Sequence, residues 1–136
     1  MVNDYSLEVG DSFELINGYG IHLHIIIAAE SEASYSQVII VYISSTETIY
    51  KDFTTIIKPG EHEYITRTDV DSWVRYQNSI LCSRSAILPE ITKHYGKISN
   101  ALLTRIQNGF LESKNVPTYM KRTLREWKIN KLYDSI

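Results

Sequence analysis

The chain has 136 residues, of which 43% are hydrophobic and 22% are charged. These values are typical of a single globular domain and exclude a wholly disordered chain. The 14 basic and 16 acidic residues give a net charge of −2, which excludes a uniformly basic nucleic-acid binder but not a local basic site. One cysteine, Cys82, excludes an intramolecular disulfide framework and any site built from several thiolates.

The N-terminal residues show no basic start followed by an apolar stretch, and no apolar run approaches the length of a membrane span. The sequence therefore predicts no signal peptide, no membrane partner and a cytoplasmic location. It contains no phosphate-binding glycine motif and no Gly-x-Ser-x-Gly elbow. Nucleotide hydrolysis and α/β-hydrolase chemistry are therefore not expected.

Up to about residue 95 the chain is expected to form short strands separated by turns. Alternation and β-branched content predict strands over 12–16, 21–29, 37–43 and 53–57, and shorter ones over 62–65, 70–76 and 79–83. Asn17-Gly18-Tyr19-Gly20 supplies a tight reversal between the first two. No helix long enough for a parallel crossover separates the first three strands, which favours a small barrel or sandwich.

The remainder of the chain is expected to be helical. Ser99 can cap a first helix, and the Asn108-Gly109 pair is predicted to end it. Pro117 suits the first turn of a second helix. Apolar residues recur at helical spacing in both segments: Leu102, Leu103, Ile106 and Phe110 in the first, and Met120, Leu124 and Trp127 in the second.

Charge divides the chain at the start of the second helix. Residues 114–136 hold six basic and two acidic residues, a net charge of +4, whereas the preceding 113 hold 8 basic and 14 acidic residues, a net charge of −6. We therefore distinguish a domain over 1–112 from a basic amphipathic helical extension over 113–136. The basic face of this extension could meet the acidic domain, RNA or an acidic partner, or simply be solvated.

Several side chains could carry chemistry. His22 and His24 are two residues apart on an expected strand, so both side chains leave the same face. Imidazole can transfer protons near neutral pH, although a histidine at a barrel end can equally well bond to a loop carbonyl. The hydroxyls of Ser44 and Ser45 could bind a phosphate oxygen or form a turn. We predict no metal site at His22, His24 and His62, because they lack a carboxylate pattern.

A second candidate segment is Ser72-Trp73-Val74-Arg75-Tyr76. Alternation places Trp73 and Arg75 on one face of a strand. An aromatic ring beside an Arg suits base stacking and phosphate contact. The same pair suits a protein interface.

Four short motifs follow one another in a recognisable order: Val9-Gly10-Asp11, the apolar segment 21–27, Tyr42-Ile43-Ser44-Ser45 and Asp71-Ser72-Trp73-Val74. Gly109, at the expected end of the first helix, is a fifth feature. Over residues 7–112 this order resembles the PemK/MazF-like toxins of bacterial type II toxin–antitoxin systems. Residues 113–136 lie outside the resemblance.

The resemblance implies a mainly β fold, namely a small SH3-like β-barrel with one or two C-terminal helices. It implies a toxin that acts as an endoribonuclease on single-stranded RNA without a metal or other cofactor. In that reaction the RNA 2′-hydroxyl attacks the adjacent phosphorus. Because family members are commonly homodimers that pair with an antitoxin, the implied partners are RNA, a cognate antitoxin and a second copy of the chain.

The resemblance also suggests roles for individual residues. His22 stands where the family has a catalytic Arg, and Ser44 stands where it has a catalytic Thr. Histidine lacks the permanent charge and bidentate fork of Arg, but it can transfer protons. We expect His22 or His24 as the base and His62 as the acid, with Ser44 and Arg75 holding the phosphate. The other candidates for RNA or phosphate contact are Ser45, Ser72, Trp73 and Tyr19.

An alternative function belongs to a different class. The domain can be a catalytically inactive SH3-like barrel, encoded by a phage or mobile element, that binds RNA or a protein. Its contacts would then be made through Tyr19, Tyr42, Trp73 and Arg75.

Overall fold

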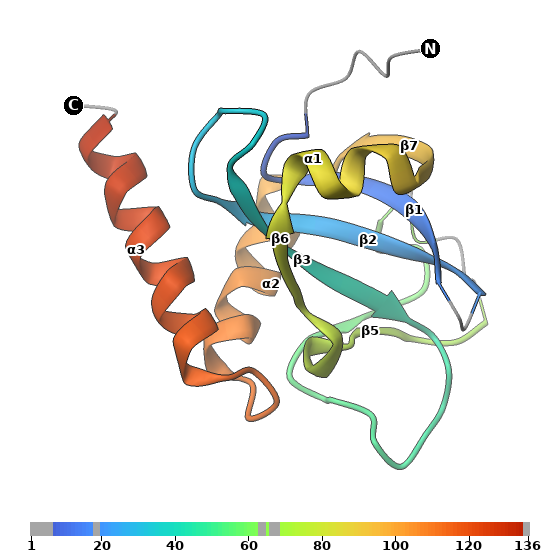
Figure 1. The fold of residues 1–136 in the computed structure, drawn as a ribbon. Helices are drawn as coiled ribbons and strands as arrows, with labels where there is room; N and C mark the ends of the chain where they lie inside the picture. The colour runs from blue at the N-terminus through green and yellow to red at the C-terminus, as the bar shows by residue number, and fades with distance from the viewer. Residues whose placement is uncertain (1–6, 18–19, 63–64, 66–68, 135–136) are drawn as a thin grey trace.

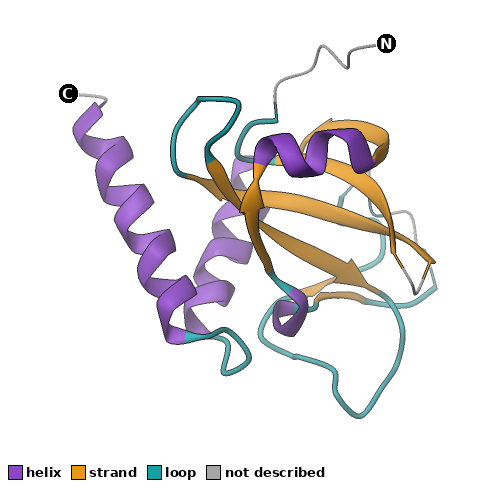
Figure 2. Cartoon of the chain, in the orientation of Figure 1, coloured by secondary structure: helices purple, strands orange, loops and turns teal. Residues whose placement is uncertain are grey.

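The fold is an antiparallel sheet followed by C-terminal helices (Figures 1 and 2). The computed structural model describes residues 7–17, 20–62, 65 and 69–134. The strands are β1 (Asp11–Asn17), β2 (Gly20–Ala29), β3 (Gln37–Ser44), β4 (Ile56–Ile57), β5 (Ser72–Val74), β6 (Ile80–Ser83) and β7 (Ile91–Lys97). The helices are α1 (Arg84–Ile87), α2 (Asn100–Glu112) and α3 (Thr118–Asp134), with 3₁₀ turns η1 (Tyr76–Asn78) and η2 (Leu88–Glu90).

Strand β3 is the centre of the sheet. The strand order is β4-β5-β3-β2-β1-β7, and β6 also pairs with β3. One edge of β3 pairs with β2, whereas the other is shared by β6 along residues 37–40 and by β5 at residues 43–44. The prediction of a mainly β chain with C-terminal helices is confirmed. The sheet is open, because β4 and β7 do not pair with each other within the described residues, so the expected closed barrel is not seen.

Both faces of the sheet carry an apolar core, which explains the near-continuous apolar sequences of β2 and β3. The first core lies between the sheet and the two long helices, which lie together on one side of the sheet (Figure 2). Met120, Leu124 and Trp127 of α3 are buried in it, as predicted. The second core lies on the opposite face and is formed by Leu7, Phe13, Leu15, Ile26, Val38, Ile40 and Ile91.

The first long helix begins where expected and ends later than expected. The Ser99 hydroxyl accepts a hydrogen bond from the backbone N–H of Leu102, at 3.2 Å, which confirms the predicted cap. The predicted stop at Gly109 is wrong, since α2 continues to Glu112. A Cβ on Gly109 would lie 2.1 Å from Thr55 Oγ1 and 2.3 Å from Tyr76 Oη. This glycine therefore permits a close approach instead of ending the helix.

Other predicted elements differ from the structure. The strand expected over 53–57 is reduced to β4, because the Asp52 carboxylate accepts the Thr54 backbone N–H at 2.8 Å and turns the chain away from an extended course. The expected strand over 62–65 falls partly outside the described residues, and neither His62 nor Ile65 lies in a strand. The strand over 70–76 shortens to β5, and the one over 79–83 is confirmed as β6. Strand β7 and helix α1 were not predicted.

Among the described residues, every helix is too short or too polar to cross a membrane.

Candidate functional site

A pocket of about 490 Å³ lies where the partner of β3 changes from β5 to β6. Strands β2 and β3 supply one part of its wall, and the β5–β6 connection with η1 supplies another. The lining residues are His22, His24, Tyr42, Ser44, Thr46, Arg75, Asn78 and Ile80. The pocket therefore brings together five residues singled out from the sequence, namely His22, His24, Ser44, Arg75 and, from the alternative function, Tyr42.

Strand register explains why the two histidines meet here. His24 pairs with Phe13 of β1 and with Tyr42 of β3, and His22 pairs with Leu15 of β1. Since Phe13 and Leu15 belong to the second core, the histidines continue that face of the sheet toward its polar end. The rings of Phe13 and His24 are stacked with centroids 6.2 Å apart.

His24 is held in one orientation and is only 3% exposed. Its Nδ1 lies 3.0 Å from the backbone carbonyl oxygen of His22, and a carbonyl only accepts, so Nδ1 carries the hydrogen. Burial lowers the pKa of His24, against the backbone hydrogen bond to His22, and positive charge on His22 lowers this pKa further. His24 is therefore neutral at physiological pH, and its Nε2 is an unprotonated acceptor.

Tyr42 packs against both imidazoles. Its ring meets His22 edge to face, with centroids 4.5 Å apart and planes at 83°, and its centroid lies 5.4 Å from that of His24. Burial raises the pKa of Tyr42, and the charge of Arg75 opposes this rise. The phenol therefore stays protonated at neutral pH and can donate a hydrogen bond.

Arg75 is the cation of the pocket. Its backbone N–H donates to the Tyr42 carbonyl at 2.8 Å, and its Nε donates to Asn78 Oδ1 at 2.6 Å. No acidic side chain of the described residues forms an ion pair with Arg75. Its outer nitrogens are thus available for an anion, and a guanidinium matches the geometry of a phosphate group.

Trp73 lies behind the pocket and does not line it. It is fully buried, its indole N–H donates to the Thr46 carbonyl at 3.1 Å, and the Arg75 guanidinium carbon lies 5.5 Å from its ring centroid. A ring with no exposed face cannot stack on a base, so the expected direct RNA contact does not fit this geometry. Trp73 instead holds Thr46 and Arg75 in place.

The serine candidates differ in position. Ser44 lines the pocket, is 5% exposed and accepts the Thr46 backbone N–H on its hydroxyl at 3.2 Å, which leaves its own O–H able to donate. Ser45 is half-buried and Ser72 is buried in β5, and neither lines the pocket.

His62 and Tyr19 are the remaining candidates from the sequence. His62 is half-buried in the segment after β4 and does not line the pocket. Tyr19 lies outside the described residues. Within the parts of the chain that the structure describes, no group of three or more His, Cys, Asp or Glu side chains is arranged to hold a metal ion.

Sequence reasoning did not include Thr46, Asn78 or Ile80 among the site residues, and it named Tyr42 only as a contact of the alternative binding module. Tyr42 precedes Ser44 by two residues on one strand, so shared alternation could have placed both on the same face. The other three lie where the chain leaves or enters a strand, and no motif marks them.

A comparison with protein-family models finds no match for this chain, and a comparison with curated proteins finds none either.

Proposed function

We propose that this protein is an endoribonuclease that cleaves single-stranded RNA and acts as a PemK/MazF-like toxin of a bacterial toxin–antitoxin system. One observation carries the proposal. Two imidazoles, a serine hydroxyl and a guanidinium without an acidic partner among the described residues line one pocket. Cleavage through the 2′-hydroxyl needs these groups: a base, an acid and donors to the phosphoryl oxygens.

His24 is suited to be the base. Its neutral Nε2 takes the proton of the 2′-hydroxyl while the 2′-oxygen attacks the adjacent phosphorus. The bond from phosphorus to the 5′-oxygen breaks, and His22 gives this oxygen a proton. The products are a 2′,3′-cyclic phosphate and a 5′-hydroxyl, and each proton transfer contributes about 10²–10⁴-fold to the rate. We assign the acid to His22, and not to His62 as first expected, because His62 does not line the pocket.

Arg75 is suited to hold the phosphate. In the resembling family a catalytic Arg occupies the place of His22, so this chain needs its cation from elsewhere. Arg75 enters the same pocket from the β5–η1 junction and pairs with no acid among the described residues. The Tyr42 phenol and the Ser44 hydroxyl are further donors toward a phosphoryl oxygen.

Incubation of the purified protein with labelled single-stranded RNA in EDTA tests the proposal. We expect cleavage by the wild type. For His22→Ala and for His24→Ala the cleavage rate should be lower by about 100-fold or more. His62→Ala is the matched control and should keep most of the activity. Absence of cleavage by the wild type contradicts the proposal, and a larger loss in His62→Ala than in His22→Ala contradicts the assignment of the acid.

The toxin role has its own test. Expression of the wild type should arrest bacterial growth, and His24→Ala should relieve the arrest. A cognate antitoxin and a homodimer belong to the same proposal. The first is tested by co-expression of the neighbouring gene, and the second by the mass of the purified protein in solution.

The second candidate is a non-catalytic module that binds RNA or a protein. The observation that favours it is the low exposure of His24 and Ser44, at 3% and 5%. A reacting 2′-hydroxyl must reach His24 Nε2, and a buried imidazole limits that access. Stoichiometric binding of RNA by the wild type without any cleavage would support this candidate.

A further inference from the structure

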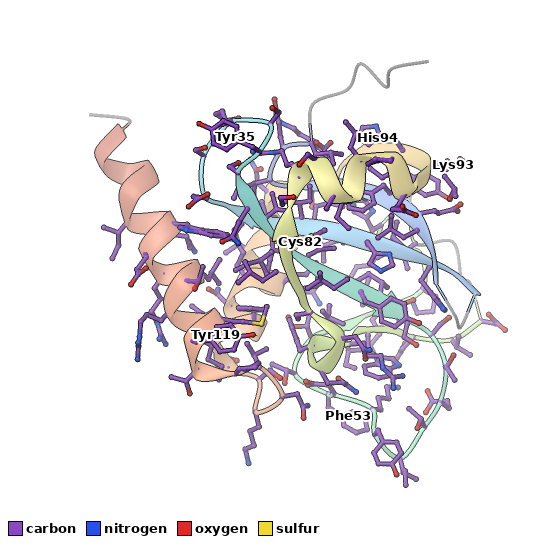
Figure 3. All side chains as sticks on the ribbon, viewed as in Figure 1. Tyr35, Phe53, Cys82, Lys93, His94 and Tyr119 are labelled. Atoms are coloured by element: carbon purple, nitrogen blue, oxygen red, sulfur yellow. The ribbon has the colours of Figure 1, made fainter. Side chains whose placement is uncertain are left out.

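The connection between β3 and β4, residues 45–55, exposes three large apolar side chains. Ile49 is 90% exposed, Tyr50 70% and Phe53 73%. In Figure 1 this connection is the long loop at the bottom of the molecule, and Phe53 lies at its lower end in Figure 3. Exposure of this degree is unfavourable for side chains of this size, so the loop is a candidate for an interaction.

The loop is held in place at both ends and in its middle. Near its start the Trp73 indole holds the Thr46 carbonyl, and in its middle Gln77 Nε2 donates to the Tyr50 carbonyl at 3.2 Å. Near its end the Asp52 carboxylate accepts hydrogen bonds from Ser113 Oγ at 2.7 Å and from Asn115 Nδ2 at 2.9 Å. The aromatic side chains are therefore presented on a fixed backbone, which lowers the entropy lost on binding.

These contacts also connect the loop to the pocket. Thr46 lines the pocket, and Gln77, which bonds to Tyr50, is next to the pocket residue Asn78 in η1. The backbone of Tyr50 therefore lies beside the rim that carries Asn78. The loop and the pocket are therefore neighbours that share Thr46 and meet at η1.

The ring of Phe53 has a cation near one side and is otherwise exposed. Lys51 Nζ lies 5.4 Å from the centroid of this ring and also forms an ion pair with Glu47 at 2.9 Å. The Lys51 side chain is only 8% exposed, whereas Phe53 remains 73% exposed. A cation near one side of the ring leaves the rest of its surface open to a planar partner.

We propose that Tyr50 and Phe53 form a stacking surface for the bases of the single-stranded RNA whose phosphate occupies the pocket. The inference rests on the proposed function, since it assumes that the pocket binds an RNA phosphate. Between Tyr50 and Phe53 the chain carries two polar residues, Lys51 and the buried Asp52. Two exposed rings on a loop that shares Thr46 with the pocket of Arg75 fit successive bases of a single strand better than they fit a protein, which needs a broad contact area.

Binding of a fully 2′-O-methylated single-stranded RNA of mixed sequence, measured by fluorescence anisotropy, tests the inference. This probe keeps its bases and phosphates but has no 2′-hydroxyl to attack, so binding is measured apart from cleavage. Phe53→Leu and Tyr50→Leu keep an apolar side chain and remove the ring, and each should weaken binding roughly 5- to 100-fold. Phe53→Trp and Tyr50→Phe should bind about as well as the wild type.

Two matched controls make the test specific. Tyr35 is 79% exposed and lies near the opposite end of the molecule from Phe53 (Figure 3), so Tyr35→Leu should leave binding unchanged. Ile49→Ala removes apolar surface from the same loop without removing a ring, and it should also leave binding unchanged.

The outcomes separate the two proposals. Binding that is unaffected by Phe53→Leu and Tyr50→Leu overturns the stacking surface, even if cleavage of ordinary RNA is observed. Ring-dependent binding without any cleavage supports the stacking surface and counts against the endoribonuclease. If Ile49→Ala loses as much binding as the ring variants, the loop makes an apolar contact and the inference is overturned. The same conclusion follows if the wild type self-associates and both Ile49→Ala and Phe53→Leu abolish this self-association.

Discussion

His24 Nδ1 lies 3.0 Å from the backbone carbonyl oxygen of His22, the residue two positions earlier on the same strand. This contact fixes the orientation and the tautomer of one imidazole by means of the backbone of the other. It also directs the remaining nitrogen, Nε2, away from that carbonyl. The contact thereby leaves Nε2 of His24 as the acceptor, which suits this residue to the role of base.

The first prediction concerns the titration of His24. Because burial lowers its pKa, its ring should titrate below the ordinary imidazole value of about 6.5 in an NMR pH series. The neutral form is the proposed base, so the fall of kcat/KM on the acidic side of its pH profile should follow this lowered pKa. A midpoint at or above 6.5 for His24 would show that burial does not dominate its pKa and would count against its assignment as the base.

The second prediction concerns Gly109 in α2. Alanine normally stabilises a helix by about 1 kcal/mol relative to glycine. Here the added Cβ meets Thr55 Oγ1 and Tyr76 Oη, which form a buried hydrogen bond at 2.7 Å, while Tyr76 also donates to the Ile106 carbonyl at 2.8 Å. Gly109→Ala should therefore lower the free energy of unfolding by about 1–3 kcal/mol.

Chemical denaturation measures this change, and the neighbouring exposed residue provides the control. Asn108→Ala lies on the same helix and should be neutral or slightly stabilising. Equal stability of Gly109→Ala and the wild type would show that Thr55 and Tyr76 can move away from α2 without loss of free energy.

The third prediction concerns Asp52, which joins the 45–55 loop to the segment between α2 and α3. Burial alone would raise its pKa, but hydrogen bonds from Thr54, Asn115 and Ser113 outweigh burial and lower the pKa. Asp52→Asn should lower the free energy of unfolding by about 1–2 kcal/mol at pH 7.

The pH dependence of this loss has a definite sign. A carboxylate with a lowered folded-state pKa stabilises the protein above the unfolded-state pKa of about 3.9 and loses this contribution as the pH falls toward the folded-state value. The difference between wild type and Asp52→Asn should therefore shrink in denaturation curves measured below pH 4. A difference that stays constant down to that range would mean that the Asp52 charge contributes nothing.

The fourth prediction concerns the C-terminal helix. Leu124 is fully buried in the first core, so Leu124→Ala should cost about 2–4 kcal/mol of unfolding free energy. Arg125→Ala, at the next and exposed position, should change it by less than about 0.5 kcal/mol. Similar stability of the two variants in thermal denaturation would mean that α3 does not share the core of the sheet.

Patterns that repeat along one element could be predicted from the sequence. Alternation predicted β1 and β-branched segments predicted β2 and β3, while apolar spacing together with Ser99 predicted the start of α2 and the buried residues of α3. The shared face of His22 and His24 also followed from alternation alone. These features depend on short-range geometry, which periodicity reports directly.

Features that depend on distant contacts could not be predicted in this way. Gly109 looked like a helix stop, but its role is set by Tyr76 and Thr55, which lie far away in sequence. The entry of Arg75 into the pocket depends on β3 exchanging one partner strand for another. The position of His62, which does not line the pocket, follows from the course of the chain after β4 and is marked by no local pattern.

Analysis of the RNA product ends by mass spectrometry tests the central claim most directly. Cleavage in EDTA should give a 2′,3′-cyclic phosphate and a 5′-hydroxyl, and one 2′-deoxy nucleotide at the preferred site should abolish cleavage there. Unchanged cleavage of the 2′-deoxy substrate, or products that begin with a 5′-phosphate, would contradict a mechanism in which His24 activates the 2′-hydroxyl.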